Sequence, residues 1–154
     1  MRLEPLLKPE LVLVLEGLSD KESVLHALAN AALGSLNGVD QTALERELAE
    51  RERRYPTSTP DGVAFPHAML PGIQNTVVVA ALLRPGVSFG VESHPAADIV
   101  FGTFGCSEKP FGHVRLLARL ARIARGPGAL DRLRAVGDGA ALFKQLVDED
   151  RLHG

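Results

Sequence analysis

The sequence has few aromatic residues, a single cysteine and no excess of positive charge. Aromatic residues make up 5% of the 154 residues, and the formal net charge is -2. Nucleic-acid binders usually combine a basic surface with rings on which bases stack, so this composition argues against a nucleic-acid partner. One thiol, that of Cys106, cannot form a disulfide within the chain and offers no thiolate cluster to a metal. We therefore expect a reducing compartment and a cytoplasmic protein.

Long apolar runs are also missing. The stretch 1–23 is interrupted by Lys8, Pro9, Glu10 and Glu16, so it is too short and too charged to insert into a membrane. It also lacks the cationic start and clean apolar core of a signal peptide. The absence of a P-loop and of a GxGxxG sequence argues against a nucleotide kinase. The histidines lack the close spacing of a zinc motif, and we expect neither a metal nor a cofactor.

Helical patterns alternate with short strand-like runs along the chain. The length suits one domain with a substantial core, and we predict a single domain over 1–154. Apolar runs at 11–15, 62–65, 76–83 and 98–105 predict strands, and the last is apolar on both faces, as a strand covered on both sides would be. The expected fold is therefore α/β, a mixed sheet of about five strands flanked by helices on both sides.

Polar residues at several positions are predicted to begin helices. Ser19 and Glu22 have the spacing of a capping box, in which each side chain satisfies an orphan amide at a helix start. Asp40 and Asp138 are expected to cap the helices that follow them. A further helix is predicted over 129–136, and these helices would cover the sheet.

The segment 111–124 predicts a strongly amphipathic helix. Three arginines on it are interpreted as its solvated face, in preference to a patch for nucleic acid or an anionic partner, because the net charge is slightly negative. These arginines are Arg115, Arg119 and Arg122. The residues expected to face the core are Val114, Leu117, Leu120, Ala121 and Ala124.

A proline–histidine pair follows the apolar run 62–65. Pro66 fixes its own φ and keeps Phe65 out of the α region, so the run stays extended. His67 is then presented at a strand end, ahead of a loop. Two interpretations stay open: a turn histidine bonded to a nearby carbonyl, or a functional imidazole, which is a good nucleophile near neutral pH.

The residues around this pair resemble the active-site segment of a known family. The stretch RERRYPTSTPDGVAFPHA (51–68) is similar to that of the EIIA domains of the bacterial sugar phosphotransferase system, in the fructose–mannitol class that includes the nitrogen-regulatory EIIA proteins. The resemblance continues through 82–90, 98–105, 113–123 and the C-terminal end, and so covers nearly the whole chain. The matching positions of the first stretch are Arg51, Glu52, Thr57, Gly62, Val63, Ala64, Pro66 and His67.

The resemblance implies a phosphocarrier that needs no metal. His67 would accept a phosphoryl group from the phosphohistidine of HPr, or of its nitrogen-system paralogue, and pass it to a cysteine of an EIIB partner. Arg51 would stabilise the phosphate with its permanently charged guanidinium, which can donate two hydrogen bonds to phosphate oxygens. His113, at an expected helix start, would donate a ring N–H beside exposed helix amides.

The loop before the apolar run departs from the family pattern. Tyr55, Pro56, Ser58 and Pro60 stand where the family commonly has glycines and smaller residues, and we expect a stiffer loop. This leaves one alternative to the phosphocarrier, a non-catalytic EIIA-like module that binds a regulatory partner.

Overall fold

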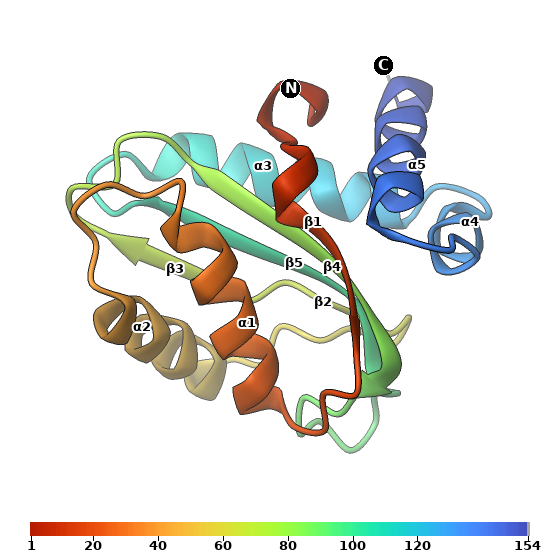
Figure 1. The fold of residues 1–154 in the computed structure, drawn as a ribbon, viewed down its shortest axis with the longest axis horizontal. Helices are drawn as coiled ribbons and strands as arrows, with labels where there is room; N and C mark the ends of the chain where they lie inside the picture. Colours follow the sequence, from red (N-terminus) through yellow and green to blue (C-terminus); the bar gives the residue numbers. More distant parts are fainter. Residues whose placement is uncertain (154) are drawn as a thin grey trace.

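The computed structural model describes residues 1–153, in which a five-stranded sheet lies between two layers of helices (Figure 1). The sheet runs in the order β1, β4, β5, and β5 then pairs with both β2 and β3 along its other edge. The β4–β5 pair is antiparallel and the others are parallel, which confirms the predicted mixed sheet. The strands are β1 (Val12–Glu16), β2 (Val63–Ala64), β3 (His67–Leu70), β4 (Val77–Val87) and β5 (Ala97–Cys106).

The helices divide between the two faces of the sheet, as predicted. One face carries α1 (Lys21–Leu33) and α2 (Gln41–Arg54). The other carries α3 (Pro110–Ala124), α4 (Ala129–Arg134) and α5 (Gly139–Leu152). Two short 3-10 turns, η1 (Glu4–Leu6) and η2 (Pro9–Leu11), lead into β1. Within residues 1–153, none of the helices combines the length and the apolar content that crossing a bilayer requires.

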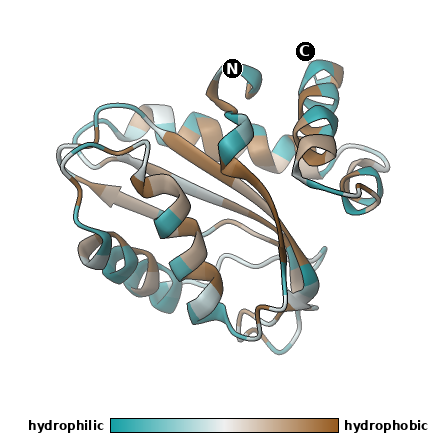
Figure 2. Cartoon of the chain, viewed as in Figure 1, coloured by the Kyte–Doolittle hydropathy of each residue, from teal (hydrophilic) through white to brown (hydrophobic). Residues whose placement is uncertain are grey.

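Alternation along β4 divides its side chains between two cores. Val77, Val79, Ala81 and Leu83 pack under α1 and α2, whereas Val78, Ala80 and Leu82 pack under the helices of the opposite face, because successive strand residues point to opposite sides. Figure 2 shows the result as brown strands at the centre and teal patches on the outward turns of the helices.

His67 begins a strand instead of preceding a loop, which corrects the prediction. β3 runs parallel to β5, with His67 opposite Thr103 and Leu70 opposite Cys106. The strand is short and stands between Pro66 and Pro71, so local sequence signals favoured a turn, and the pairing with β5 overrides them. β4 likewise continues through Val87, beyond its predicted end at 83, with a shift of register against β5 after Leu82.

Two of the three predicted caps are confirmed. The side chains of Asp40 and Asp138 accept from backbone amides in the first turns of α2 and α5. The capping box expected from Ser19 is wrong, because Asp20 is the N-cap of α1 and accepts from the amide of Ser23 at 2.8 Å. Asp and Ser cap about equally well, so propensity alone could not choose between neighbouring positions.

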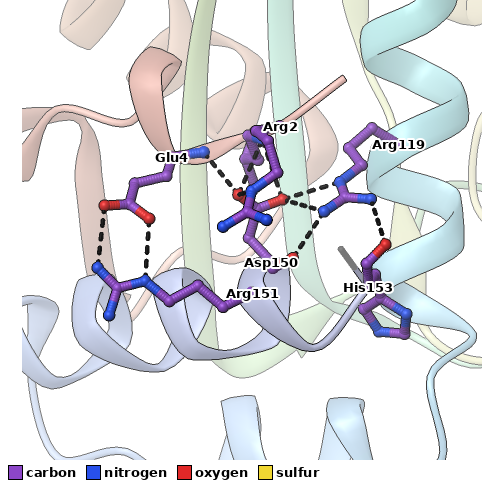
Figure 3. Close-up of polar contacts among 7 residues, drawn as sticks. Arg2, Glu4, Arg119, Asp150, Arg151 and His153 are labelled. Atoms are coloured by element: carbon purple, nitrogen blue, oxygen red, sulfur yellow. Dashed lines mark hydrogen bonds and ion pairs between the residues drawn. The ribbon is translucent and has the colours of Figure 1, made fainter.

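The orientation of α3 also differs from the prediction. Val114 was expected inside but is 61% exposed, while Arg119 was expected in solvent but is 7% exposed. Arg119 is buried because its guanidinium pairs with the fully buried Asp150 of α5 (Figure 3). Apolar residues occur on more than one face of this helix, so they alone could not fix which face is buried. The residues that α3 buries are His113, Leu116, Arg119, Leu120 and Ile123.

Candidate functional site

The three residues predicted for the site meet beside the edge strand β3. Arg51 comes from the last turn of α2, His67 is the first residue of β3, and His113 lies in the first turn of α3. Arg51 Nε donates to His67 Nε2 at 3.0 Å. The rings of His67 and His113 have their centroids 5.1 Å apart, with planes tilted by 48°. The arrangement places one cation and two imidazoles around a single point.

The position of β3 at the edge of the sheet explains how residues from both helical layers meet. Ala68 points into the core under α1 and α2, so by alternation its neighbour His67 points towards the side of α3. Arg51 belongs to α2 on the first face, which packs against β3. Its long side chain reaches the ring across the free edge of this strand, which an inner strand would not permit.

Both ring nitrogens of His67 have partners that fix its tautomer. Nδ1 lies 2.9 Å from the Phe65 carbonyl oxygen, which only accepts, so Nδ1 carries the hydrogen. Nε2 receives the N–H of Arg51 and therefore holds the lone pair. Burial is the main reason that the pKa of His67 lies below its usual value; the Phe65 carbonyl opposes the shift, Arg51 adds to it, and Glu52 opposes it. At neutral pH the ring is a neutral nucleophile at Nε2.

His113 is a buried imidazole with an unused nitrogen. It is 4% exposed, and its Nε2 lies 3.4 Å from the hydroxyl of Thr103. Its Nδ1 has no hydrogen-bond partner, and over the described residues 1–153 no other buried side-chain nitrogen or oxygen lacks one. Gly105 leaves room for the ring, since a Cβ there would lie 2.9 Å from Nδ1. Burial, reinforced by His67, lowers the pKa of His113 to about 4, so the ring is neutral at pH 7.

The guanidinium of Arg51 has no carboxylate partner within the described part of the chain. Nη1 of Arg51 donates to the carbonyl of Tyr55 at 2.7 Å. The central guanidinium carbon, Cζ, lies 5.9 Å from the centroid of the Tyr55 ring. The adjacent Glu52 turns its carboxylate to Thr57, which donates its amide at 2.6 Å and its hydroxyl at 2.5 Å. The charge of Arg51 is thus free to bind an anion.

Large apolar side chains lie exposed on both sides of the two imidazoles. Tyr55 is 73% exposed beside Arg51, while Phe111 and Val114, which flank His113 in the chain, are 84% and 61% exposed. Exposed aromatic and aliphatic groups of this size are typical of surfaces that a protein partner covers. The site therefore lies within a surface suited to docking.

Sequence reasoning missed the groups that orient the two rings. Glu52 and Thr57 belong to the quoted motif, but no role followed from their spacing. Thr103 and Gly105 carried no signal at all, because only the parallel register of β3 with β5 brings them to His67 and His113. The interpretation of His67 as a turn histidine expected a bond to a nearby carbonyl, and the structure shows that carbonyl to be the one of Phe65.

A family model shows that the protein is a component of a phosphotransferase system. The family model described as "Phosphoenolpyruvate-dependent sugar phosphotransferase system, EIIA 2" matches residues 5–149. The chain belongs to this family, and it is a phosphocarrier or regulatory component of that system, as the sequence resemblance implied.

The relatives include nitrogen-regulatory members of the family. A nitrogen regulatory protein of Bradyrhizobium diazoefficiens is 30% identical over 147 residues, covering 96% of this chain and 95% of its own. One from Pseudomonas aeruginosa is 28% identical over 148 residues, with 96% of each chain covered. Solved structures with this fold include the IIA-Ntr protein of Neisseria meningitidis (TM-score 0.84, 17% identity, 94% of this chain and 98% of that one). The IIA mannitol protein of Escherichia coli also shares it (TM-score 0.73, 21% identity, 91% and 98%).

Proposed function

We propose that the protein is a histidine phosphocarrier in which Nε2 of His67 receives the phosphoryl group. The observation that carries this proposal is the neutral ring of His67, whose Nε2 lone pair faces an arginine without a carboxylate partner. A neutral imidazole is nucleophilic. A guanidinium without a carboxylate partner can bind two phosphate oxygens at once through bidentate hydrogen bonds. Family membership supports phosphotransfer, and the geometry supports the choice of atom.

Before transfer, the hydrogen bond from Arg51 to the lone pair on Nε2 of His67 must break. The phosphorus atom must approach Nε2 in line with the departing nitrogen of the donor, so the guanidinium moves from Nε2 to the phosphoryl oxygens. The lone pair of Nε2 then forms the new N–P bond. The P–N bond of the donor phosphohistidine breaks, and its electron pair returns to the donor ring. The ring of His67 keeps the hydrogen on Nδ1 and becomes positively charged.

His113 supports the same phosphoryl group from the opposite side. Its ring is neutral, and its Nε2 lies by Thr103, the residue opposite His67 in the sheet, whereas Nδ1 lies against Gly105. With its hydrogen on Nε2, the ring would donate to the phosphoryl group from that nitrogen. The amides in the first turn of α3 add the partial positive charge of a helix start. Together with Arg51, these groups offset the negative charge of a bound phosphate.

We infer a donor of the HPr type, or its nitrogen-system paralogue, and an EIIB-type or regulatory acceptor. The mannitol IIA protein of Escherichia coli, which shares this fold (TM-score 0.75, 18% identity), has been solved as a complex with phosphorylated IIB. The exposed Tyr55, Phe111 and Val114 would contact such partners. The names of both curated relatives favour a regulatory use of the phosphorylated state. We also propose one domain over 1–154 and a cytoplasmic location.

A phosphorylation assay tests the proposal. The protein is incubated with phosphoenolpyruvate, enzyme I and HPr, and acid-labile phosphate is measured in the wild type and in His67→Ala. We expect the wild type to become labelled and the variant to remain unlabelled. If the wild type gains no phosphate while an established EIIA protein does in the same mixture, the chain is a non-catalytic interaction module.

A further inference from the structure

Gly105 of β5 lies where two side chains pack directly onto the backbone of a strand. A Cβ at this residue would lie 2.9 Å from Nδ1 of His113, 3.1 Å from Sδ of Met69 and 3.5 Å from Cβ of His113. Non-bonded carbon contacts are favourable at about 3.5–4.0 Å. Any side chain at position 105 would therefore displace at least one of these two neighbours.

The backbone conformation of Gly105 does not require a glycine. The residue lies inside β5, pairs with Met69 of β3, and does not have the positive φ that favours glycine. A glycine inside a strand weakens the strand, and it often marks a place where another group approaches the backbone closely. Here the group that approaches most closely is the ring of His113, so the glycine supplies space for that ring.

The ring of His113 cannot move away from the strand together with its helix. In the turns that follow, Leu116 and Leu120 fix α3 to the core on this face of the sheet. Nε2 of the ring lies 3.4 Å from the hydroxyl of Thr103, which pairs with His67, and the centroids of the two rings are 5.1 Å apart. A methyl group beneath the Nδ1 edge would force the ring itself to turn out of this place.

We propose that Gly105 is a positioning residue for phosphoryl transfer, because its missing side chain lets the ring of His113 lie beside His67 and donate to the phosphoryl group. This inference rests on the proposed role of His67. As Nε2 of His67 forms the N–P bond, the P–N bond of the donor breaks and its electron pair returns to the donor ring. The charged phosphoryl oxygens then need a donor that is already in place.

The variant Gly105→Ala tests this proposal by adding one methyl group beneath the ring. Gly102→Ala is the matched control, because a Cβ at Gly102 of the same strand would lie similarly close to a side chain, 3.1 Å from Leu28 in the core under α1. Three quantities are measured in both variants: the free energy of unfolding, the pKa of His113 by nuclear magnetic resonance, and single-turnover transfer from phosphorylated HPr over a range of donor concentrations.

For Gly105→Ala we expect the maximal transfer rate to fall by about 10- to 100-fold, because a misplacement of about 1 Å can cost ~10² in rate. The half-saturating donor concentration should stay within about twofold of wild type, since Gly105 is buried. The pKa of His113, about 4 in the wild type, should rise towards its ordinary value as the ring becomes less buried.

Gly102→Ala should keep the wild-type rate and the wild-type pKa of His113, even where it lowers the free energy of unfolding. A wild-type maximal rate in Gly105→Ala would overturn the proposal. Equal slowing in Gly102→Ala would also overturn it, because overpacking of β5 would then explain the effect without any role for the position of His113.

Removal of the Met69 side chain keeps the test possible if Gly105→Ala does not fold. Met69→Ala opens space on one side of position 105, so the double variant Met69→Ala/Gly105→Ala can accommodate the added methyl group there, whereas its contact with His113 remains. The double variant should transfer the phosphoryl group about 10-fold or more slowly than Met69→Ala alone. Equal rates of these two variants would refute the proposal.

Labelling of the wild type separates this inference from the proposed function. If the wild type is not phosphorylated on His67, the proposed function fails, and the role of Gly105 in transfer fails with it. If the wild type is phosphorylated there and Gly105→Ala transfers at the wild-type rate, only the inference about Gly105 fails.

Discussion

Two arginines, Arg51 of the candidate site and Arg119 of α3, show how the same side chain is left without a carboxylate in one place and paired with a buried carboxylate in another. Arg51 is half-buried and bonds only to an imidazole lone pair and to a backbone carbonyl. Arg119 is 7% exposed and donates to the carboxylate of Asp150 and to the carbonyls of Asp150 and His153. Within residues 1–153 the charge of Arg51 has no carboxylate partner, whereas that of Arg119 is neutralised by Asp150.

The cluster around Arg119 joins the two ends of the chain (Figure 3). Asp150 accepts from the amides of Leu3 and Glu4 as well as from Arg119, so the N-terminal turn is fastened to α5 (Figures 1 and 3). Burial alone would raise the pKa of Asp150, but these amides and Arg119 outweigh it and hold the pKa below its usual value. The difference between the regions is therefore one carboxylate: Asp150 faces Arg119, whereas Glu52 turns away from Arg51.

Removing Asp150 should have the largest effect and should leave the site intact. In Asp150→Ala, Arg119 keeps its backbone carbonyl partners but becomes a buried charge without a carboxylate, and we expect a loss of about 3–5 kcal/mol in the free energy of unfolding. Chemical denaturation measures this loss. At a temperature where the variant is folded, its rate of phosphoryl transfer should match that of wild type; a slow but stable variant would contradict the separation of the two regions.

Removing Arg51 should produce the reverse pattern. In Arg51→Met, transfer from phosphorylated HPr should slow by about 10² to 10³, because a pre-placed donor to the phosphoryl group is lost. The free energy of unfolding should change little, since no buried ion pair is broken. Single-turnover labelling and denaturation of the same preparation give both values. Unimpaired transfer would show that Arg51 does not bind the phosphate.

Acidification should lower the free energy of unfolding, because His113 becomes protonated. Its folded pKa of about 4 lies below the unfolded value of 6.5, so the unfolded chain binds the proton more readily. The stability that neutral His113 contributes is complete above pH 6.5 and is lost as the pH falls towards 4, by about 3 kcal/mol. His67 acts in the same direction. In His113→Asn, the free energy of unfolding should fall less between pH 7.5 and pH 4 than in wild type; equal slopes would contradict the assigned burial cost.

The smallest effect is expected at the surface of the terminal cluster. Arg151 forms a two-bond ion pair with Glu4 at 3.1 Å, but both side chains are well exposed. Such pairs contribute little to stability because water screens them and because both side chains lose freedom. Glu4→Gln should therefore lower the melting temperature only slightly, and the loss should shrink further in high salt. A loss comparable to that of Asp150→Ala would place the pair inside the buried network.

The sequence predicted the sheet and the meeting of Arg51, His67 and His113, because strand patterns and an ordered family motif cover those segments. It missed β3 and chose the wrong buried face of α3, and both errors have one reason. The conformation of both depends on distant partners, β5 for His67 and Asp150 for Arg119. For the same reason the sequence did not indicate Thr103 and Gly105. These residues lie next to the imidazoles only because of the register between β3 and β5. The role of each site residue stays a prediction until phosphate is placed on the protein.

The central claim concerns one atom, Nε2 of His67, and phosphorus–nitrogen coupling in the phosphorylated, nitrogen-15-labelled protein tests it directly. We predict a coupling to Nε2 of His67, a hydrogen retained on Nδ1, and changed shifts for the guanidinium of Arg51 and the ring of His113. Phosphate on Nδ1, or on any other histidine, would contradict the account.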